Sequence, residues 1–286
     1  MALEKDISID QIPDEGETPG IVREVPPIYY RDGGRSSDAL QYVIEKESSE
    51  RVFDPTHPRV SSAGNCITRQ TGIMLGLFTS DIDPMYSEAG HKLQAAAYER
   101  YLKIWPDTVE EVSVQTCIPG VYTHPDIVVP SKNLVIQVKS VTCWAMNNGK
   151  TPKETAIAQV MLEWHFFKRY KKYFYAGKQW DFEPIHYEIL YLSRDRWGLR
   201  SEAFTMVYDK QYAEKLEKNF KLVYDSYSWG ELPRNQKPAA DHECGFTTKG
   251  GWGKAKEDIV CPLYQHCWGK EYERPFEEKK TRAKKS

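Results

Sequence analysis

The chain has 286 residues, of which 40% are hydrophobic and 28% are charged, and this is an ordinary composition for one large globular domain with or without a small appendage. Its formal net charge of −2 excludes a protein that coats duplex nucleic acid through a general excess of cationic side chains. The sequence has no apolar signal segment and no apolar run of about 18 residues, so we expect a soluble, cytoplasmic protein with no membrane partner.

The two ends of the chain differ in charge from the middle. The first 25 residues contain seven acidic and two basic side chains, and we interpret residues 1–37 as an acidic, flexible segment. Residues 38–84 are expected to form a helical segment that contains Cys66. Residues 271–286 are rich in lysine and are interpreted as a basic tail.

A helix followed by a hairpin is predicted in the first half of the chain. Residues 85–102 are rich in Ala and Leu, with apolar side chains at helical spacing, and His91 lies near the start of this helix. The apolar runs after Asp126 and over residues 133–141 predict two antiparallel strands. Residues 130–133 are the expected turn, because Pro, Ser and Asn favour turns.

The predicted hairpin brings three polar side chains together. With the turn at residues 130–133, the pairing sets Asp126 directly opposite Gln137, where facing Cβ atoms lie about 4.5–5.5 Å apart. Gln137 and Lys139 are two residues apart on one strand and therefore share a face. Asp126 and Gln137 are therefore close enough to share one hard cation. The alternative is an ordinary hairpin with a polar stripe that faces solvent.

These residue types suit the cleavage of phosphodiesters. A phosphate diester resists attack because it is anionic, so a nuclease needs a divalent cation to neutralise developing charge and to activate water. Asp126 would supply an anionic oxygen ligand and Gln137 a neutral one. Lys139 would position the attacking water or stabilise the charged transition state. The pattern therefore suggests a metal-dependent phosphodiesterase site.

The second half of the chain continues with helices and strands. A helix with Pro in its first turn is predicted over residues 152–167. Strands are predicted at residues 185–192 and 199–208, and a second amphipathic helix at residues 212–229.

Basic and aromatic side chains are interspersed in residues 168–175. Lys168 and Arg169 could contact DNA phosphates here, while the aromatic rings stack on unpaired bases. The alternative is a helix that buries its aromatic side chains and leaves its basic side chains exposed to water.

The order of these features resembles the RecB-like branch of the PD-(D/E)XK nuclease superfamily, over about residues 60–270. The resemblance implies an α/β (α+β) fold, with a restriction-endonuclease-like αβββαβ core of residues 85–208 in which helices flank a mixed central sheet. It also implies that the metal, the water and the DNA are bound by the residues at the family's motif positions, which are His91, Asp126, Gln137, Lys139 and, in a supporting role, Gln159.

Two positions depart from that family's pattern. Gln137 stands where the family usually has an acid, which removes a negative charge and weakens metal binding unless another carboxylate, such as Glu163 or Glu99, reaches the site. Gly90 directly precedes His91, whereas the family commonly places the Gly four residues before the His. A lone His on a largely apolar helix can also be a hydrogen-bonded core residue, so both interpretations of His91 stay open.

Six cysteines in a chain expected in a reducing compartment suggest a metal site rather than disulfides. Cys66 precedes the predicted core, and Cys244, Cys261 and Cys267 follow it within residues 209–270, a region that we expect to hold the C-terminal helix and a cysteine cluster. Scattered buried thiols are the alternative.

This arrangement resembles the iron–sulfur nucleases, which include the CRISPR-associated exonucleases of the Cas four family, their viral relatives and the AddB-type repair nucleases. The resemblance implies a [4Fe–4S] cluster that joins the N- and C-terminal parts of the fold. Its implied ligands are the four cysteines named above. Four thiolates also suit structural zinc.

The remaining cysteines and histidines have other expected roles. His242 and His266 are possible substitutes for a cysteine ligand. Cys117 and Cys143 have no partner at metal spacing, and we expect both to be small core residues.

The sequence therefore predicts a Mg²⁺- or Mn²⁺-dependent DNA exonuclease with a structural iron–sulfur cluster. Its expected substrate is single-stranded DNA or DNA ends, in recombination, repair or CRISPR adaptation, with proteins of those processes as potential partners. The alternative hypothesis is a DNA-binding or assembly module of the same fold whose hydrolytic site has decayed. Gln137 is the observation that motivates this alternative.

Overall fold

The structure is a computed structural model, and it describes residues 57–77, 84–195, 200–233, 245–247 and 258–269. The predicted acidic segment, the basic tail and Cys244 lie outside the described residues.

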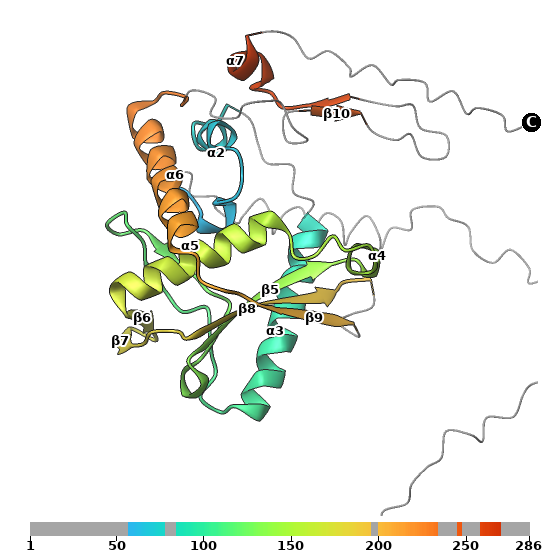
Figure 1. The fold of residues 1–286 in the computed structure, drawn as a ribbon, viewed down its shortest axis with the longest axis vertical. Coiled ribbons are helices and arrows are strands. Elements are labelled where there is room, and N and C mark those ends of the chain that lie inside the picture. The colour runs from blue at the N-terminus through green and yellow to red at the C-terminus, as the bar shows by residue number, and fades with distance from the viewer. Residues whose placement is uncertain (1–56, 78–83, 196–199, 234–244, 248–257, 270–286) are drawn as a thin grey trace, which may run out of the picture. The chain divides into compact units, whose positions relative to one another are not determined.

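A mixed five-stranded sheet forms the centre of the fold (Figure 1). Its strands, in spatial order, are β1 (Val109–Glu110), β4 (Ile127–Val129), β5 (Leu134–Val141), β8 (His186–Ser193) and β9 (Ser201–Thr205). β5 and β8 run parallel, while the other neighbouring pairs are antiparallel. The predicted fold class, a mixed central sheet flanked by helices, is thereby confirmed.

The longer helices are α2 (Ile67–Met74), α3 (Pro84–Ile104), α5 (Glu154–Tyr170) and α6 (Lys210–Trp229). Along the chain, three strands of the main sheet, β1, β4 and β5, come after α3 and before α5, as the αβββαβ order predicts. The shorter elements are η2 (Val60–Ser62), β2 (Val114–Gln115), β3 (Tyr122–Thr123), η3 (Pro130–Lys132), α4 (Cys143–Asn147), β6 (Lys172–Tyr175), β7 (Lys178–Asp181), β10 (Gly245–Thr247), β11 (Asp258–Val260) and α7 (Tyr264–Trp268).

Alternation along β5 decides which helix each side chain meets, because successive strand residues point to opposite faces. Leu134, Ile136 and Val138 belong to a buried cluster with Leu93 and Ala97 of α3. The odd-numbered residues point the other way, and Val135 and Val141 are buried in the larger cluster that contains α5. Gln137 and Lys139 are odd-numbered and therefore face α5.

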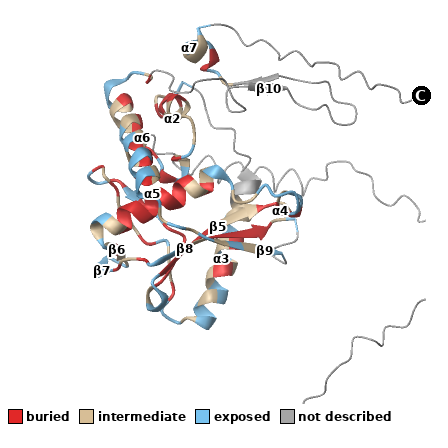
Figure 2. Ribbon diagram, in the orientation of Figure 1, coloured by how far each residue is buried: buried red, intermediate tan, exposed pale blue. Residues whose placement is uncertain are grey.

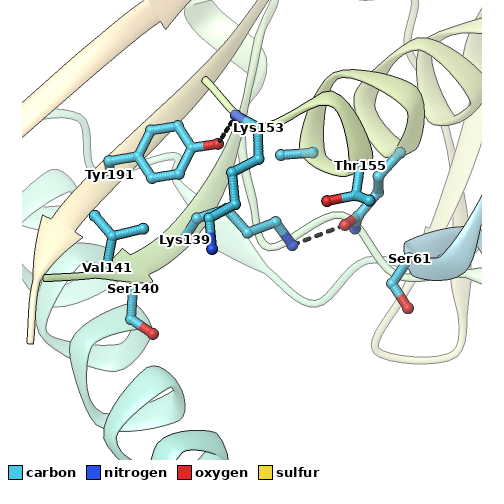
Figure 3. A pocket seen from close by; sticks show the side chains of 9 residues that line it. Ser61, Lys139, Ser140, Val141, Lys153, Thr155 and Tyr191 are labelled. Carbon is cyan, nitrogen blue, oxygen red and sulfur yellow. Dashed lines mark hydrogen bonds between the residues drawn. The ribbon is translucent and has the colours of Figure 1, made fainter. Parts of the chain in front are cut away.

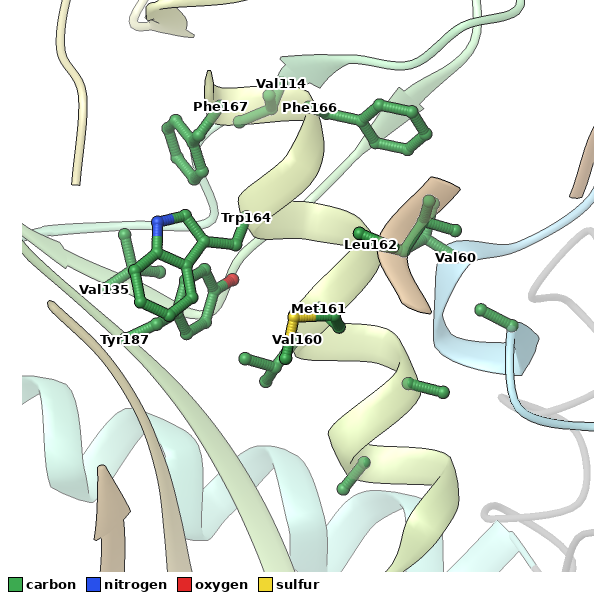
Figure 4. Packing of buried hydrophobic residues seen from close by; sticks show 14 of the residues in the cluster. Val60, Val114, Val135, Val160, Met161, Leu162, Trp164, Phe166, Phe167 and Tyr187 are labelled. Carbon is green, nitrogen blue, oxygen red and sulfur yellow. The ribbon is translucent and has the colours of Figure 1, made fainter. Parts of the chain in front are cut away.

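Helix α5 is the most deeply buried helix described (Figure 2). Phe166 and Phe167 are fully buried, and Trp164 packs against Tyr187 of β8 with a ring separation of 5.8 Å (Figure 4). Burying one such side chain stabilises the fold by about 1.5–3 kcal/mol, so the packing holds α5 firmly on the sheet. The polar residues of α5 that face the sheet are consequently held in fixed positions.

The predicted register of the hairpin is confirmed. Ile127 lies opposite Ile136 and Val129 lies opposite Leu134, which is the pairing that sets Asp126 across from Gln137. The turn is the short helix η3, closed by Asn133 in the left-handed conformation with φ of 47°. Asn accepts that conformation more readily than most residues, which explains its place in the turn.

One local expectation needs correction. Residues 168–175 are not one helix, because α5 ends at Tyr170, Lys171 takes a left-handed conformation with φ of 52°, and β6 follows.

Cys143 lies just after β5, at the start of the short helix α4. The Thr142 side chain accepts a hydrogen bond from the Ala145 amide and caps that helix. Cys143 is buried, as expected for a core residue.

The structure describes no helix that is both long enough and apolar enough to span a membrane.

Candidate active site

Asp126 and Gln137 interact directly across the β4–β5 pair. The Gln137 Nε2 donates to Asp126 Oδ2 at 2.5 Å, and the backbone N–H of Val138 donates to the same oxygen at 2.7 Å. Both side chains are nearly enclosed, with exposed fractions of 9% for Asp126 and 2% for Gln137. The two residues that the hairpin register predicted to converge do so.

The other end of the Gln137 amide lacks a partner. Its Oε1 atom is buried without a hydrogen bond to any described residue. A buried acceptor in this state costs about 1–3 kcal/mol, so native structures seldom leave one without a reason. The orphaned oxygen beside a carboxylate is the kind of position at which a hard cation replaces a hydrogen-bond donor.

Lys139 is held by α5. Its Nζ donates to Gln159 Oε1 at 2.7 Å, and Gln159 is itself buried. The lysine reaches from β5 toward the helix in Figure 3, where a dashed line marks this bond. Gln159, for which a supporting role was predicted, therefore contacts Lys139 directly and fixes the position of its ammonium group.

Glu163 lies one turn further along α5 and is completely buried. Its Oε1 accepts hydrogen bonds from Thr123 at 3.1 Å and from Gln159 Nε2 at 2.9 Å. The hydroxyl of Tyr187 donates to its Oε2. A continuous chain of contacts therefore runs from Lys139 through Gln159 to Glu163.

Burial dominates the electrostatics of the two carboxyl groups. It raises the pKa of Asp126 to about 7, and the neighbouring Glu163 adds to the rise, while Lys139 and the hydrogen bonds from Val138 and Gln137 oppose it. Burial also raises the pKa of Glu163, against the lowering effect of its bonds from Tyr187 and Gln159. An acid that titrates near neutrality beside a lysine is characteristic of functional sites.

A pocket of about 190 Å³ opens beside Lys139 (Figure 3). It is lined by Ser61, Lys139, Ser140, Val141, Lys153, Thr155, Ala156, Gln159 and Tyr191. This lining includes two lysines and four hydroxyl groups, with no acidic side chain. The first turn of α5 also contributes, and the N-terminus of a helix carries partial positive charge. The pocket therefore suits an anion.

The donor set fits a divalent cation such as Mg²⁺ or Mn²⁺. Both metals prefer oxygen ligands, and Asp126 and the orphaned Gln137 Oε1 supply one anionic and one neutral oxygen side by side. Within the described part of the chain, no group of three or more His, Cys, Asp and Glu side chains could hold a metal ion. The two oxygens are thus a partial ligand set.

His91 lies on a different layer from these residues. It is an exposed residue of α3, and α3 packs on the even-numbered face of β5, opposite to Gln137 and Lys139. The preceding Gly90 lies near Ser140, with 3.6 Å between an ideal Cβ and Ser140 Oγ, which places this part of α3 at the C-terminal end of β5. No group of three metal-binding side chains that includes His91 is found among the described residues, and its role as a ligand stays a prediction.

Lys168 and Arg169, the basic residues predicted to contact DNA, lie on the last turn of α5, and both side chains contact other residues of the protein. The Lys168 Nζ is 3.7 Å from Glu183 Oε1 and also lies over the Tyr208 ring. Arg169 Nη2 donates to Glu217 Oε2 at 2.8 Å. These contacts tie α5 to its neighbours, so a DNA role for either residue stays a prediction.

Three of the four predicted cluster ligands, Cys66, Cys261 and Cys267, are described, and each is partly exposed. Cys66 occupies the N-cap position of α2, and Cys267 lies in α7. Because Cys244 lies outside the described residues, the iron–sulfur or zinc site stays a prediction. Cys117 is partly buried against the main core, and burial raises its pKa to about 12, as expected for an unreactive thiol.

Sequence reasoning missed four residues that complete the site. Thr123 and Tyr187 bind Glu163, while Ser61 and Lys153 line the pocket. The alternation of β8 could have indicated Tyr187, because residues 187, 189 and 191 share the face toward α5. No local signal in the sequence indicates Ser61, which reaches the pocket only through packing of η2 against α5.

No protein-family model matches the chain, and no curated protein matches it. Among solved structures, the chain is similar to the alkaline exonuclease LHK-Exo from Laribacter hongkongensis, with a TM-score of 0.44 and 14% identity over 62% of this chain and 90% of that one. It is also similar to a phage-related exonuclease from Haemophilus somnus 129PT, with a TM-score of 0.43 and 12% identity over 60% of this chain and 94% of that one. These likenesses concern the backbone alone and assign no residue a role.

Proposed function

We propose that this protein is a metal-dependent deoxyribonuclease that hydrolyses phosphodiester bonds at the site formed by Asp126, Gln137 and Lys139. The observation that carries the proposal is the orphaned Gln137 Oε1, which is buried beside the Asp126 carboxylate at the predicted metal position. A divalent cation there would satisfy an oxygen that has no donor among the described residues.

The chain's own residues divide the work. Asp126 and Gln137 would hold Mg²⁺ or Mn²⁺, and the bound cation would supply charge neutralisation at the phosphate and activation of water. Lys139 carries a positive charge that acts on Asp126, and it would stabilise the negative charge that develops on the phosphate. The pocket beside Lys139, lined by Lys153 and hydroxyl groups, would receive the anionic backbone of the substrate. His91 as a further ligand belongs to this proposal.

The finer assignment follows the resemblance of the motifs to RecB-like nucleases. The proposed activity is exonucleolytic, on single-stranded DNA or DNA ends, in recombination, repair or CRISPR adaptation. We further propose that Cys66, Cys244, Cys261 and Cys267 hold a [4Fe–4S] cluster, with zinc as the alternative metal. The cluster would have a structural role and would take no part in hydrolysis.

The test is a metal-dependent digestion assay. We expect the wild-type protein to degrade labelled DNA with Mg²⁺ or Mn²⁺ and to lose that activity in chelator, while Asp126→Asn stays folded and inactive. Lys132→Ala, which changes an exposed lysine at the hairpin turn, is the matched control and should keep full activity. A folded, metal-replete wild-type protein that cleaves no DNA would contradict the proposal.

A second candidate function is a DNA-binding or assembly module with a decayed site. Gln137 favours it, because a neutral amide in place of an acid lowers the negative charge available to a cation. The two hypotheses differ in one variant. A decayed site should gain metal binding and cleavage in Gln137→Glu from a wild-type baseline of none, whereas an active site has measurable activity before the change.

A further inference from the structure

The proposed chemistry does not explain why a carboxyl group is buried at Glu163. Its side chain is completely buried, and the three side chains that bind it, Thr123, Gln159 and Tyr187, all donate to its oxygens. Burying an acid costs free energy even when it is paired, and apolar residues of similar size are often as stabilising or more so. A carboxyl group at this position therefore calls for a role other than stability.

The hydrogen bonds around Gln159 suggest what that role is. A primary amide has one accepting end and one donating end, so fixing one end fixes the other. The Gln159 Nε2 donates to Glu163 at 2.9 Å, and this leaves Gln159 Oε1 directed at Lys139, whose Nζ is 2.7 Å away. The reverse orientation would point an amide N–H₂ at an ammonium group and lose both contacts.

We propose that Glu163 is a positioning residue: by accepting the Gln159 amide N–H, it orients the Gln159 carbonyl toward Lys139 and so holds the Lys139 ammonium beside Asp126 and Gln137. Thr123 and Tyr187 fix the carboxyl group in turn, since each donates to one of its oxygens. The inference rests on the proposed function for its catalytic consequence, although the placement of Lys139 can be measured without any activity.

This role differs from that of a metal ligand, which was the sequence-based expectation for a carboxylate at residue 163. Both oxygens of Glu163 already accept hydrogen bonds from protein side chains, and three such bonds use most of what a carboxyl group can accept. A metal ligand must offer an oxygen to the cation. Glu163 therefore acts through Gln159 and Lys139.

Two substitutions separate these roles. Glu163→Gln keeps the shape and an oxygen that accepts from Gln159 and Thr123, while its new amide can donate to the Tyr187 hydroxyl, which accepts as well as donates. Glu163→Met keeps the length but replaces both carboxyl oxygens with a thioether, which is only a weak acceptor. Glu217→Met is the matched control, because Glu217 joins α5 to α6 through His165 and Arg169, outside this network.

The measurements are kcat and KM on labelled DNA, Mn²⁺ affinity by calorimetry, and the rate at which acetic anhydride acylates Lys139, followed by mass spectrometry. We expect Glu163→Gln to resemble the wild type in all of these. Glu163→Met should lose about 100-fold in kcat with little change in KM or Mn²⁺ affinity, as misplacement of a catalytic group predicts. It should also acylate at Lys139 about tenfold faster, because the ammonium has lost its fixed acceptor.

Loss of Mn²⁺ affinity in Glu163→Gln would overturn the proposal and make Glu163 a ligand. Unchanged kcat and unchanged Lys139 acylation in Glu163→Met would overturn it as well. If the wild type cleaves no DNA, the proposed function fails, but the acylation rates still decide the positioning role.

If Glu163→Met does not fold, the double variant that combines Gln159→Glu with Glu163→Gln tests the positioning role instead. This double variant keeps a polar side chain at both positions. Residue 159 can accept a hydrogen bond from Lys139, and residue 163 can donate one to residue 159. The proposal requires this double variant to hold Lys139 better than Gln159→Glu alone, and purely additive effects would contradict it.

Discussion

Gln137 donates a hydrogen bond to the Asp126 carboxylate across two antiparallel strands, at 2.5 Å, and its own carbonyl oxygen is buried without a partner among the described residues. Under the proposed function, this relationship would allow a glutamine to serve where an acid is expected. Its amide neutralises part of the charge on Asp126 in the absence of metal, and its oxygen remains available to a cation.

Replacing Gln137 with Glu should strengthen metal binding and weaken the metal-free protein. Two carboxylates opposite each other repel, and the hydrogen bond to Asp126 is lost, so the melting temperature without metal should fall. A second anionic ligand should raise Mn²⁺ affinity at least tenfold, or ~1.4 kcal/mol, as measured by calorimetric titration. Gln179→Glu, on the exposed strand β7, should change neither quantity. Equal Mn²⁺ affinities for Gln137→Glu and wild type would remove residue 137 from the site.

Metal binding should depend on pH through Asp126. Its pKa rises from 3.8 to about 7 in the folded protein, and a divalent cation binds the ionised carboxylate. We therefore expect Mn²⁺ affinity to fall about tenfold for each pH unit below 7 and to level off above it. Calorimetry in buffers of different ionisation enthalpy should detect about one proton released per metal bound near pH 6. A pH-independent affinity between pH 5 and 8 would exclude Asp126 as the ligand.

The same shift affects stability in the opposite sense from an ordinary salt-bridged acid. Between pH 4 and 7 the folded state holds a proton on Asp126 that the unfolded state has lost, so the metal-free protein should become less stable as pH rises through this window. Asp126→Asn should weaken that dependence, and what remains comes from Glu163, whose pKa is also raised by burial. Urea denaturation at a series of pH values measures it, and an identical pH profile in the two proteins would contradict the assignment.

Local signals accounted for the hairpin and for the polar residues on it. Proline, serine and asparagine at 130–133 set the turn, and the turn set the register that brings Asp126 to Gln137. Lys139 followed from the two-residue period of a strand. These predictions succeeded because each depends on residues within a short stretch of chain.

The rest of the site depends on contacts between distant segments. Tyr187 reaches Glu163 because β8 pairs in parallel with β5, and the sequence does not specify the offset of a parallel pair. Ser61 reaches the pocket because η2 packs on α5. The place of His91 also depends on long-range packing, because α3 packs on the even-numbered face of β5, and its role as a ligand stays a prediction.

Two glycines should respond oppositely to alanine. A Cβ on Gly64 would lie 2.9 Å from Thr155 Cα and 3.0 Å from Ala158 Cβ, so Gly64→Ala should cost about 1–3 kcal/mol and disturb the nearby pocket residue Ser61. A Cβ on Gly90 meets only Ser140 Oγ at 3.6 Å, and alanine is the better helix former by up to ~1 kcal/mol. Urea unfolding of both variants provides the check. A stabilised Gly64→Ala would show that η2 does not pack closely on α5.

The cysteine cluster predicts a difference between two thiols. Cys267→Ala should lose iron or zinc and fall in thermal stability, because metal binding is coupled to folding. Cys143→Ala removes a buried thiol of the core and should keep its metal, with only a modest loss of stability. Metal analysis of both proteins, purified without oxygen, makes the comparison. Equal metal content in the two variants would remove Cys267 from the ligand set.

The most direct test of the nuclease assignment is digestion of end-labelled single- and double-stranded DNA with Mg²⁺ or Mn²⁺, comparing wild type with Lys139→Ala, both prepared without oxygen. Removing one preorganised charge donor should lower kcat by about 10²–10³-fold without unfolding the protein. Degradation that starts from a DNA end in the wild type and is nearly lost in Lys139→Ala is the predicted result. Equal degradation by both proteins, or none by folded wild type with its metal bound, would contradict the account.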